Sequence, residues 1–254
     1  MFTVGEVACV VNGKLIGISP EVEITGVSTD SRTVKQGDLF FALRGVRFDG
    51  HQFVEQALHK GAVCAVVEEE NPPCVLVKDS TEALRDLARW YRQSLGIPIV
   101  AVTGSVGKTT TKELIGRCLS KRMKASVCEK SYNNFIGLPL SLLRMTKETE
   151  VGVVELGMNV PGEIGILSEV ALPTVGVITA VGPVHLEGLI SVDAVRREKF
   201  DILKGLSSDG MLVLNVDIEV PDGVVLPRRA TVSYTHLRAH ETRHDLVCRL
   251  LLEK

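Results

Sequence analysis

The sequence predicts a two-domain α/β protein whose second domain is built on a parallel sheet. Continuous apolar runs of strand length recur in the second half of the chain, as expected for strands covered on both faces. They lie at residues 97–102, 151–156, 174–181 and 211–216. Helical segments lie between these runs, which is the alternation of a βαβ fold. A glycine-rich turn follows the first run and precedes its helix, a third sign of this class.

The first 95 residues have a different pattern, in which short β-like runs alternate with turns. The expected elements are strands at 38–43, 62–68 and 75–77, a turn at 71–74 and a helix at 51–61. In that helix Phe53, Ala57 and Leu58 share one face, and Gly61 is its expected C-terminal stop. We therefore expect a small N-terminal α/β domain over residues 1–95.

A second helix is expected at the end of this domain. Asp79 and Glu82 have the spacing of a capping box. Apolar residues then recur at helical intervals, namely Leu84, Leu87, Ala88, Tyr91 and Leu95. Gly96 and Pro98 end the helix, and the first long apolar run begins at once. We place the domain boundary near residue 95 and expect the parallel-sheet domain over residues 96–229.

The composition is that of an ordinary globular protein. The chain has 254 residues, 45% of them hydrophobic, and a net charge of −2. This near-neutral balance gives no reason to expect nucleic acid or a membrane surface as a partner. No apolar run approaches the roughly 20 residues that span a bilayer, and the N-terminus lacks a secretion signal. Six scattered cysteines without a C-x-x-C pair indicate reduced thiols, so we expect a cytoplasmic location.

The stretch "VTGSVGKTTTKE" has the order strand, glycine-rich turn, helix. Successive backbone N–H groups in such a turn face phosphate oxygens, and the helix adds its positive dipole end. Lys108 would reach the β- and γ-phosphates of ATP, and the Thr109 hydroxyl would hold Mg²⁺. The general motif has an earlier glycine where this chain has Val102, and a turn without a ligand is the alternative. The expected nucleotide-binding residues are Gly104, Ser105, Val106, Gly107, Lys108, Thr109 and Thr110.

Two further positions point to the same edge of the predicted sheet as the phosphate loop. Glu155 ends one predicted strand and His185 follows the next, where open α/β sheets bind their ligands. A carboxylate and an imidazole beside phosphates suit Mg²⁺. Taken singly, Glu155 could be a loop carboxylate and His185 a structural histidine. Asn133 and Asn134 precede a Gly-Leu-Pro turn between these elements.

Four of these stretches, in this order, resemble the Mur ligases of bacterial cell-wall synthesis, and most closely their MurF branch. They are "TGSVGKTTTKE", "NNFIGLPLSLL", "ELGMNVPGEI" and "GPVHLEGL". A fifth, "GVSTDSRTVKQGDLFFALRGVRFDGHQFVEQALHKGA", resembles the uridine-nucleotide-binding domain of the MurE and MurF branches. The resemblance covers about residues 1–225. A residue other than glycine at position 102 is normal in this family, so Val102 does not count against a phosphate-binding loop.

The resemblance implies an ATP-dependent amide ligase that adds D-alanyl-D-alanine to a UDP-muramoyl tripeptide through an acyl phosphate. Lys108, with Mg²⁺ on Thr109 and Glu155, would neutralise the anions that must meet. His185 is similar to the ligand of a second metal ion. Lys199 aligns with a lysine that becomes carbamylated in the family, whereas charge patterning alone favours an exposed helix lysine.

The resemblance also implies two groups of substrate-binding residues. Thr29, Asp30, Ser31 and Arg32 would hold the uridine nucleotide, and their alternative is a polar turn. Asn133 and Asn134 would face the muramoyl substrate, and their alternative is a pair of turn-forming amides. The expected partners are small molecules, and we expect a monomer.

The last residues change character from about Ala230. His240-Glu241-Thr242-Arg243-His244 spells H-E-x-x-H, the helix motif of zinc peptidases. A catalytic zinc needs a third ligand and a cleft, and His236 on the same helix gives poor tetrahedral geometry. We interpret residues 230–254 as a non-native tail that resembles translated sequencing-adapter DNA, so the chain is expected to be truncated.

Three alternatives to a MurF-type ligase remain. A MurE-type or folylpolyglutamate-type ligase shares the phosphate loop, although "TKE" and "ELGMN" favour MurF. The truncated chain could instead be a module that binds the UDP-sugar and ATP without turnover, and we expect it to be inactive by itself. A zinc peptidase is the third alternative and the weakest.

Overall fold

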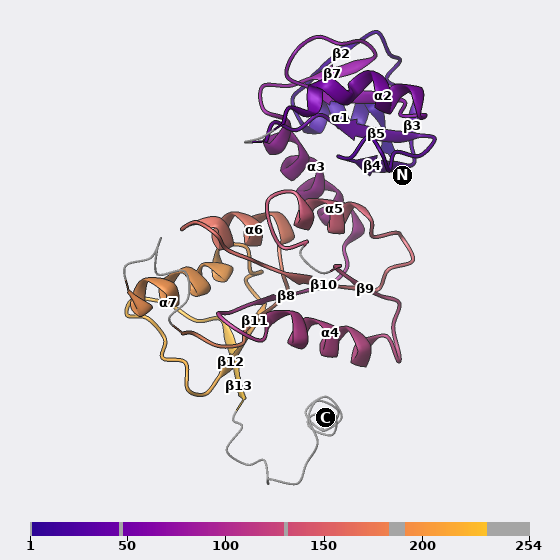
Figure 1. Ribbon diagram of the computed structural model, residues 1–254. Coiled ribbons are helices and arrows are strands. Elements are labelled where there is room, and N and C mark those ends of the chain that lie inside the picture. Colours follow the sequence, from indigo (N-terminus) through magenta and orange to yellow (C-terminus); the bar gives the residue numbers. More distant parts are fainter. Residues whose placement is uncertain (1, 46–47, 130–131, 183–190, 233–254) are drawn as a thin grey trace. The chain divides into compact units, whose positions relative to one another are not determined.

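The computed structural model is a mixed α/β protein with parallel sheets, as the sequence predicts (Figure 1). It describes residues 2–45, 48–129, 132–182 and 191–232. The chain divides into two compact units, the first made of Met1–Ser94 with Leu142–Arg144 and the second of Leu95–Ser141 with Met145–Lys254. Within the described ranges no helix has the length and apolar character needed to cross a membrane.

The first unit is built on a five-stranded sheet of order β2-β7-β6-β5-β4. Its strands are β2 (Lys14–Ile16), β4 (Gly26–Ser28), β5 (Asp38–Phe41), β6 (Cys64–Val67) and β7 (Cys74–Leu76). Only the edge strand β2 pairs antiparallel, with β7. A two-stranded sheet pairs β1 (Phe2–Thr3) with β3 (Glu23–Ile24). The helices are α1 (Val4–Val10), the 3₁₀ helix η1 (Gly50–Phe53), α2 (Val54–His59) and α3 (Ser80–Leu95).

The core of the first unit surrounds β5 and β6, which are buried along their whole length. Phe40 lies 1% exposed in a cluster with Val54, Ala57, Ala65 and Val67. The two apolar runs that predicted strands are therefore the centre of the sheet, where both faces are covered.

The predicted helix at 51–61 is only partly correct. The 3₁₀ turn η1 precedes α2 and changes the helical phase. As a result Phe53 is 40% exposed, while Val54 and Ala57 are buried. The expectation that Phe53 faces the core was wrong, because a single α-helical period was assumed across the turn.

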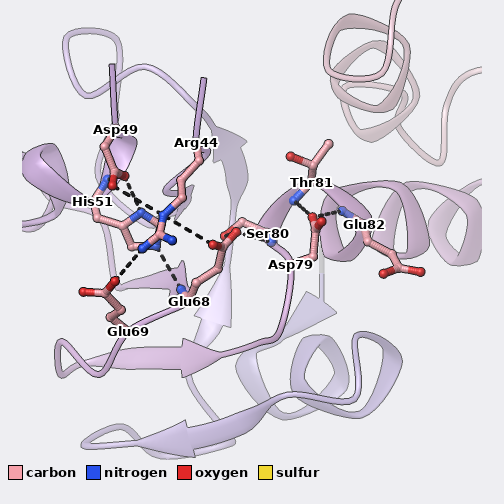
Figure 2. Close-up of polar contacts among 9 residues, drawn as sticks. All are labelled: Arg44, Asp49, His51, Glu68, Glu69, Asp79, Ser80, Thr81 and Glu82. Carbon is pink, nitrogen blue, oxygen red and sulfur yellow. Dashed lines mark hydrogen bonds and ion pairs between the residues drawn. The ribbon is translucent and has the colours of Figure 1, made fainter. Parts of the chain in front are cut away.

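The N-terminus of α3 is capped by Asp79 (Figure 2). Its Oδ1 accepts hydrogen bonds from the backbone N–H of Thr81 at 2.7 Å and of Glu82 at 2.8 Å. On the same helix Leu84, Leu87, Ala88 and Tyr91 are buried, as their spacing predicts.

We expect Asp79→Ala to lower the free energy of unfolding by about 1 kcal/mol, because two N–H groups lose their acceptor. Chemical denaturation measures this change. Asp86→Ala on the exposed side of the same helix is the matched control, and it should change stability by less than about 0.5 kcal/mol. Equal effects of the two substitutions would show that the cap contributes nothing specific.

The second unit is built on a six-stranded, entirely parallel sheet of order β13-β12-β11-β8-β10-β9. Its strands are β8 (Ile99–Thr103), β9 (Ala125–Val127), β10 (Val151–Glu155), β11 (Val175–Ile178), β12 (Met211–Asn215) and β13 (Arg228–Val232). Its helices are α4 (Lys108–Leu119), α5 (Gly137–Leu143), α6 (Glu163–Ala171), α7 (Val192–Phe200) and the 3₁₀ helix η2 (Asp201–Lys204).

The order of strands creates a switch point between β8 and β10. From β8 the chain runs through α4 to β9 on one side, and from β10 it runs through α6 to β11 on the other. Right-handed crossovers in opposite directions put their helices on opposite faces, and Figure 1 shows α4 and α6 so placed. A crevice forms outside the carboxyl ends of strands at such a point. The residues after Thr103 and at Glu155 therefore lie at the position where this fold binds ligands.

The far edge of this sheet is β13. It pairs with β12 as far as Val232, two residues past the point where the sequence suggested a change of character. The start of the tail at residue 230 stays a prediction. The H-E-x-x-H motif at residues 240–244 lies outside the described residues.

Candidate nucleotide-binding site

The loop between β8 and α4 curls as a phosphate-binding loop requires. Gly104 has φ +142° and Gly107 has φ +83°, backbone conformations that favour glycine. A Cβ on Gly104 would lie 2.1 Å from Oγ1 of Thr179, so a side chain has no room there. Gly107 is also the N-cap of α4 and gives it no side-chain cap. The first N–H groups of α4 are thus oriented to bind an anion.

Lys108 begins α4 beside this loop. Its Nζ donates a hydrogen bond of 2.8 Å to the Gly104 carbonyl, which folds the side chain back over the loop. Burial lowers the pKa of Lys108, and the nearby Glu155 carboxylate opposes that shift. A partly desolvated cation over a turn of N–H groups is suited to phosphate oxygens.

Glu155 ends β10 and is only 4% exposed. One of its oxygens accepts a hydrogen bond from the Thr109 hydroxyl at 2.8 Å, and the other accepts one from Asn133 Nδ2 at 2.9 Å. A carboxylate and a hydroxyl in contact are hard oxygen ligands of the kind that Mg²⁺ prefers. No group of three His, Cys, Asp or Glu side chains suited to a metal occurs in the described ranges. Glu155 and Thr109 therefore suit a Mg²⁺ ion whose other ligands would be phosphate oxygens and water.

The remaining loop residues divide into two kinds. Val106 is 62% exposed at the loop tip, and Thr110 is exposed on α4. Ser105 faces the segment after β11 instead, because its N–H donates to the Ala180 carbonyl at 2.8 Å. Its hydroxyl also exchanges hydrogen bonds with the backbone of Gly182. The Ser105 N–H is thus paired within the protein, and its expected part in phosphate binding stays a prediction.

The two asparagines have different surroundings. Asn133 holds Glu155 through Nδ2, and its carbonyl accepts the Gly157 N–H at 2.8 Å. Asn134 Oδ1 accepts the backbone N–H groups of Ile136 and Gly137 and so forms the turn before α5. Asn134 has the contacts of the turn-forming alternative, and the substrate role of both residues stays a prediction.

Lys199 lies on α7 and is only 2% exposed. The exposed helix lysine favoured by charge patterning was therefore wrong. Burial, and to a smaller extent repulsion from Lys108, lower its pKa to about 8, while Glu198 opposes both effects. Its Nζ contacts Met158 Sδ at 3.9 Å. Lys108 is thus near enough for its charge to act on Lys199, and the carbamylation of Lys199 stays a prediction.

We expect half of the Lys199 side chains to lose their proton near pH 8, because the buried ammonium is desolvated. In the unfolded chain the pKa returns towards 10.5, so the unfolded state binds more protons between the two values. This group's contribution to stability therefore rises with pH across that window. A titration of ¹³Cε-labelled lysine by NMR, with Lys199→Met for assignment, measures the midpoint. Lys204, whose pKa is raised by Asp201, is the internal control, and equal midpoints would contradict the expectation.

Two buried charges near the site were missed by the sequence analysis. Glu198 accepts the backbone N–H of Gly162 at 2.8 Å and of Ile164 at 3.2 Å, and so caps α6 from α7. Lys112 is fully buried on α4 and donates to the Cys128 carbonyl at 2.6 Å. Lys112 lies one turn after Lys108, a spacing that could have drawn attention to it. Nothing local marks Glu198, because its partners are more than 30 residues away.

The expected uridine-binding residues form a tight polar turn after β4 in the first unit. The Arg32 guanidinium donates to Asp30 at 2.9 Å from Nε and 2.7 Å from Nη2, and its backbone N–H bonds the same carboxylate. The Arg32 hydrogen bond lowers the pKa of Asp30 to about 2. The buried Ser31 donates to Gln56 Oε1 at 2.7 Å. With Thr29 these residues follow the carboxyl end of β4.

A second polar cluster lies at the same edge of the first sheet, after β5 and β6 (Figure 2). His51 accepts the Glu68 N–H at Nε2, so its proton lies on Nδ1, which bonds Asp49 at 2.6 Å. Arg44 Nε lies 3.4 Å from both Asp49 and Glu68. Glu68 in turn accepts the N–H and the hydroxyl of Ser80 at the start of α3. These contacts connect the loop after β5 to the end of β6 and to the start of α3.

Comparison with known proteins identifies the family. The model of the Mur ligase middle domain matches residues 102–245, more than half of the chain. The chain belongs to the Mur ligase family. A second model, the Mur ligase family catalytic domain, matches residues 23–92. The two matches cover the phosphate loop and the turn after β4, so both candidate regions lie in recognised Mur ligase sequence.

Two curated relatives with the same name illustrate this membership. The chain is 42% identical over 220 residues to the UDP-N-acetylmuramoyl-tripeptide–D-alanyl-D-alanine ligase of Bacillus subtilis, covering 83% of this chain and 48% of the relative. The same-named protein of Escherichia coli is 36% identical over 218 residues, covering 85% of this chain and 48% of the relative. The chain thus spans about half the length of the curated Mur ligases it matches.

A solved Mur ligase structure agrees with this fold. MurF from Acinetobacter baumannii superposes with a TM-score of 0.79 at 33% identity, covering 85% of this chain and 49% of that one. His185, expected as a second metal ligand, lies outside the described residues.

Proposed function

We propose that this chain is the nucleotide-binding part of an ATP-dependent Mur ligase that adds D-alanyl-D-alanine to a UDP-N-acetylmuramoyl tripeptide. One observation carries the proposal. At the switch point between β8 and β10, Lys108 folds over the phosphate loop, and beside it Thr109 bonds Glu155. MurF from Thermotoga maritima, crystallised in complex with ADP, supports it, with a TM-score of 0.73 at 33% identity over 82% of this chain and 49% of that one. The chain's relatives in the D-alanyl-D-alanine-adding branch favour that substrate over others of the family.

The proposed reaction has two steps, transfer of a phosphoryl group from ATP to the tripeptide carboxylate and then attack by the dipeptide amine. An oxygen of the tripeptide carboxylate attacks the γ-phosphorus of ATP, the bond to the bridging oxygen breaks, and ADP leaves. The dipeptide amine then attacks the carbonyl carbon of the acyl phosphate, loses a proton, and expels inorganic phosphate. Lys108 and the N–H groups at the start of α4 would hold the phosphates and reduce repulsion between the two anions.

A divalent cation fits this site through Thr109 and Glu155. When bound, Mg²⁺ supplies positive charge to the phosphate oxygens. Asn133 orients the carboxylate by its hydrogen bond to Glu155. The buried Lys199, with its pKa lowered to about 8, is more readily neutral than an ordinary lysine, which carbamylation by CO₂ requires.

The first unit would hold the UDP-linked substrate. The turn Thr29–Arg32 and the loop after β5 meet at one edge of a parallel sheet, where such folds bind ligands. The Arg32 guanidinium is exposed and could reach a diphosphate, although Asp30 now pairs with it. The cytoplasmic location and the monomeric state expected from the sequence stay predictions.

An amine panel tests the function. A complete Mur ligase that contains this chain would be given ATP and Mg²⁺ with one of three substrate pairs. These are UDP-muramoyl tripeptide with D-alanyl-D-alanine, UDP-muramoyl dipeptide with a diamino acid, and a folate with glutamate. We expect release of ADP and phosphate, with formation of the amide, only with D-alanyl-D-alanine. Turnover only with a diamino acid would indicate the MurE-type reaction, and turnover only with glutamate the folylpolyglutamate type. Either result would overturn the proposal.

A further inference from the structure

Thr179 connects the end of β11 to the phosphate loop. The residue directly follows β11, and its backbone N–H donates to the Thr103 carbonyl at 3.0 Å, which extends the pairing of β11 with β8. Its side chain thereby faces Gly104, where a Cβ would come within 2.1 Å of the hydroxyl. The glycine at this position is what allows the threonine to approach the loop so closely.

The Thr179 hydroxyl has one proton and two carbonyl oxygens within reach. Oγ1 lies 2.6 Å from the Val106 oxygen and 3.2 Å from the Thr103 oxygen. The Thr103 oxygen already accepts the Thr179 N–H, and the shorter distance is typical of a good O–H···O bond. The proton therefore belongs to the bond with Val106.

This bond fixes the orientation of a peptide group in the loop. The peptide between Val106 and Gly107 is trans, so its C=O and N–H point in opposite directions. Because the carbonyl is held towards β11, the Gly107 N–H is directed away from β11. The N–H of the peptide between Gly104 and Ser105 donates to Ala180, and the Ser105 hydroxyl bonds Gly182, so this part of the loop is also held against the segment after β11.

We propose that Thr179 is a positioning residue of the phosphate loop, whose hydroxyl holds the Val106 carbonyl so that the Gly107 N–H is presented to nucleotide phosphate. The inference rests on the proposed nucleotide binding and deepens it. Thr179 is not a ligand in this account, since its proton is used within the protein. Its contribution is to keep the loop in the phosphate-binding conformation before ATP arrives.

The same strand provides a matched control at its other end. Thr174 precedes β11, its N–H donates to the Ile99 carbonyl at 2.9 Å, and its hydroxyl donates to that oxygen at 3.2 Å. Thr174 and Thr179 therefore make the same kind of contact with β8, but only Thr179 reaches the phosphate loop. Replacing either threonine should lower the stability of the unit, whereas only the replacement of Thr179 should lower the affinity for nucleotide.

The experiment is calorimetric titration of Mg·ATP into the wild-type chain and into Thr179→Ala, Thr179→Ser and Thr174→Ala. We expect Thr179→Ala to weaken binding about tenfold, which corresponds to the loss of one hydrogen bond. Thr179→Ser keeps the hydroxyl and should bind within about twofold of wild type, as should Thr174→Ala. Wild-type affinity in Thr179→Ala would overturn the inference.

Hydrogen exchange separates this inference from the proposed function. Mass spectrometry of peptides that contain residues 104–108, without nucleotide, should show faster exchange in Thr179→Ala than in wild type or Thr174→Ala. Unchanged exchange would refute the positioning role even if no variant bound ATP. Absence of ATP binding by wild type would refute the proposed function, while the exchange result would still decide the role of Thr179.

Discussion

Replacing Lys108 with methionine is expected to weaken ATP binding by about 100-fold. A hydrogen bond to a charged group contributes roughly 1.5–3 kcal/mol, and here a partly buried ammonium faces phosphate oxygens. Methionine keeps most of the side-chain length and packing but removes the charge and all three donors. Because the hydrogen bond of Lys108 Nζ within the described residues goes to the Gly104 carbonyl, its loss should disturb the fold little. Equilibrium titration with ATP in the presence of Mg²⁺ measures the change.

Lys121→Met is the matched control for this experiment. Lys121 is exposed just past the C-terminus of α4, whereas Lys108 is at its N-terminus. The control removes one positive charge at the opposite end of the same helix. It should leave the affinity for ATP within about twofold of wild type, since screening limits charge effects beyond roughly 10 Å. Similar losses in both variants would indicate a nonspecific effect of net charge and would contradict the assignment of Lys108.

Phe40→Ala is expected to lower the free energy of unfolding of the first unit by about 3–5 kcal/mol, because it removes a ring from a closed core. Phe40 is 1% exposed on the inner strand β5 and packs among Val54, Ala57, Ala65 and Val67. No neighbouring side chain in this cluster is large enough to fill the volume of a lost phenyl ring. Denaturant unfolding, followed by a probe in the first unit, measures the loss.

Phe48→Ala is the control for that substitution. Phe48 is 68% exposed, so its removal should change stability by less than about 0.5 kcal/mol. The pair removes the same chemical group from a buried and an exposed position of one unit. A loss of less than about 1 kcal/mol in Phe40→Ala would mean that the core around β5 is not closed as described.

The sequence predicted the parts of the fold that leave a local signature. The apolar runs that became β8, β10 and β11 are largely buried parallel strands, and such strands are continuous in hydrophobicity. The run that became β12 also forms a parallel strand, although its residues are alternately buried and half-buried. Short strands left no such signature. The three residues of β9 are all half-buried and were not predicted, because neither a run nor an alternation can be recognised over that length.

The candidate site was predictable from the sequence where its residues lie at the carboxyl ends of predicted strands. Lys108, Thr109 and Glu155 come together because they sit at or after the carboxyl ends of adjacent strands. The roles of Glu198 and Thr179 depend on partners 36 and 73 residues away, so no local pattern could reveal them. The burial of Lys199 was likewise invisible to charge patterning, because it is set by contacts distant in sequence, such as that with Met158, rather than by its neighbours in sequence.

Titration of ATP into the wild-type chain, with and without Mg²⁺, tests the central claim most directly. If residues 104–109 hold the phosphates and Thr109 with Glu155 holds the metal, ATP should bind at one site. Mg²⁺ should then strengthen that binding by at least about tenfold, since the cation would join the Glu155 carboxylate to the ATP phosphates and offset their repulsion. Binding that is absent, or that has the same affinity with Mg²⁺ and with EDTA, would contradict the account.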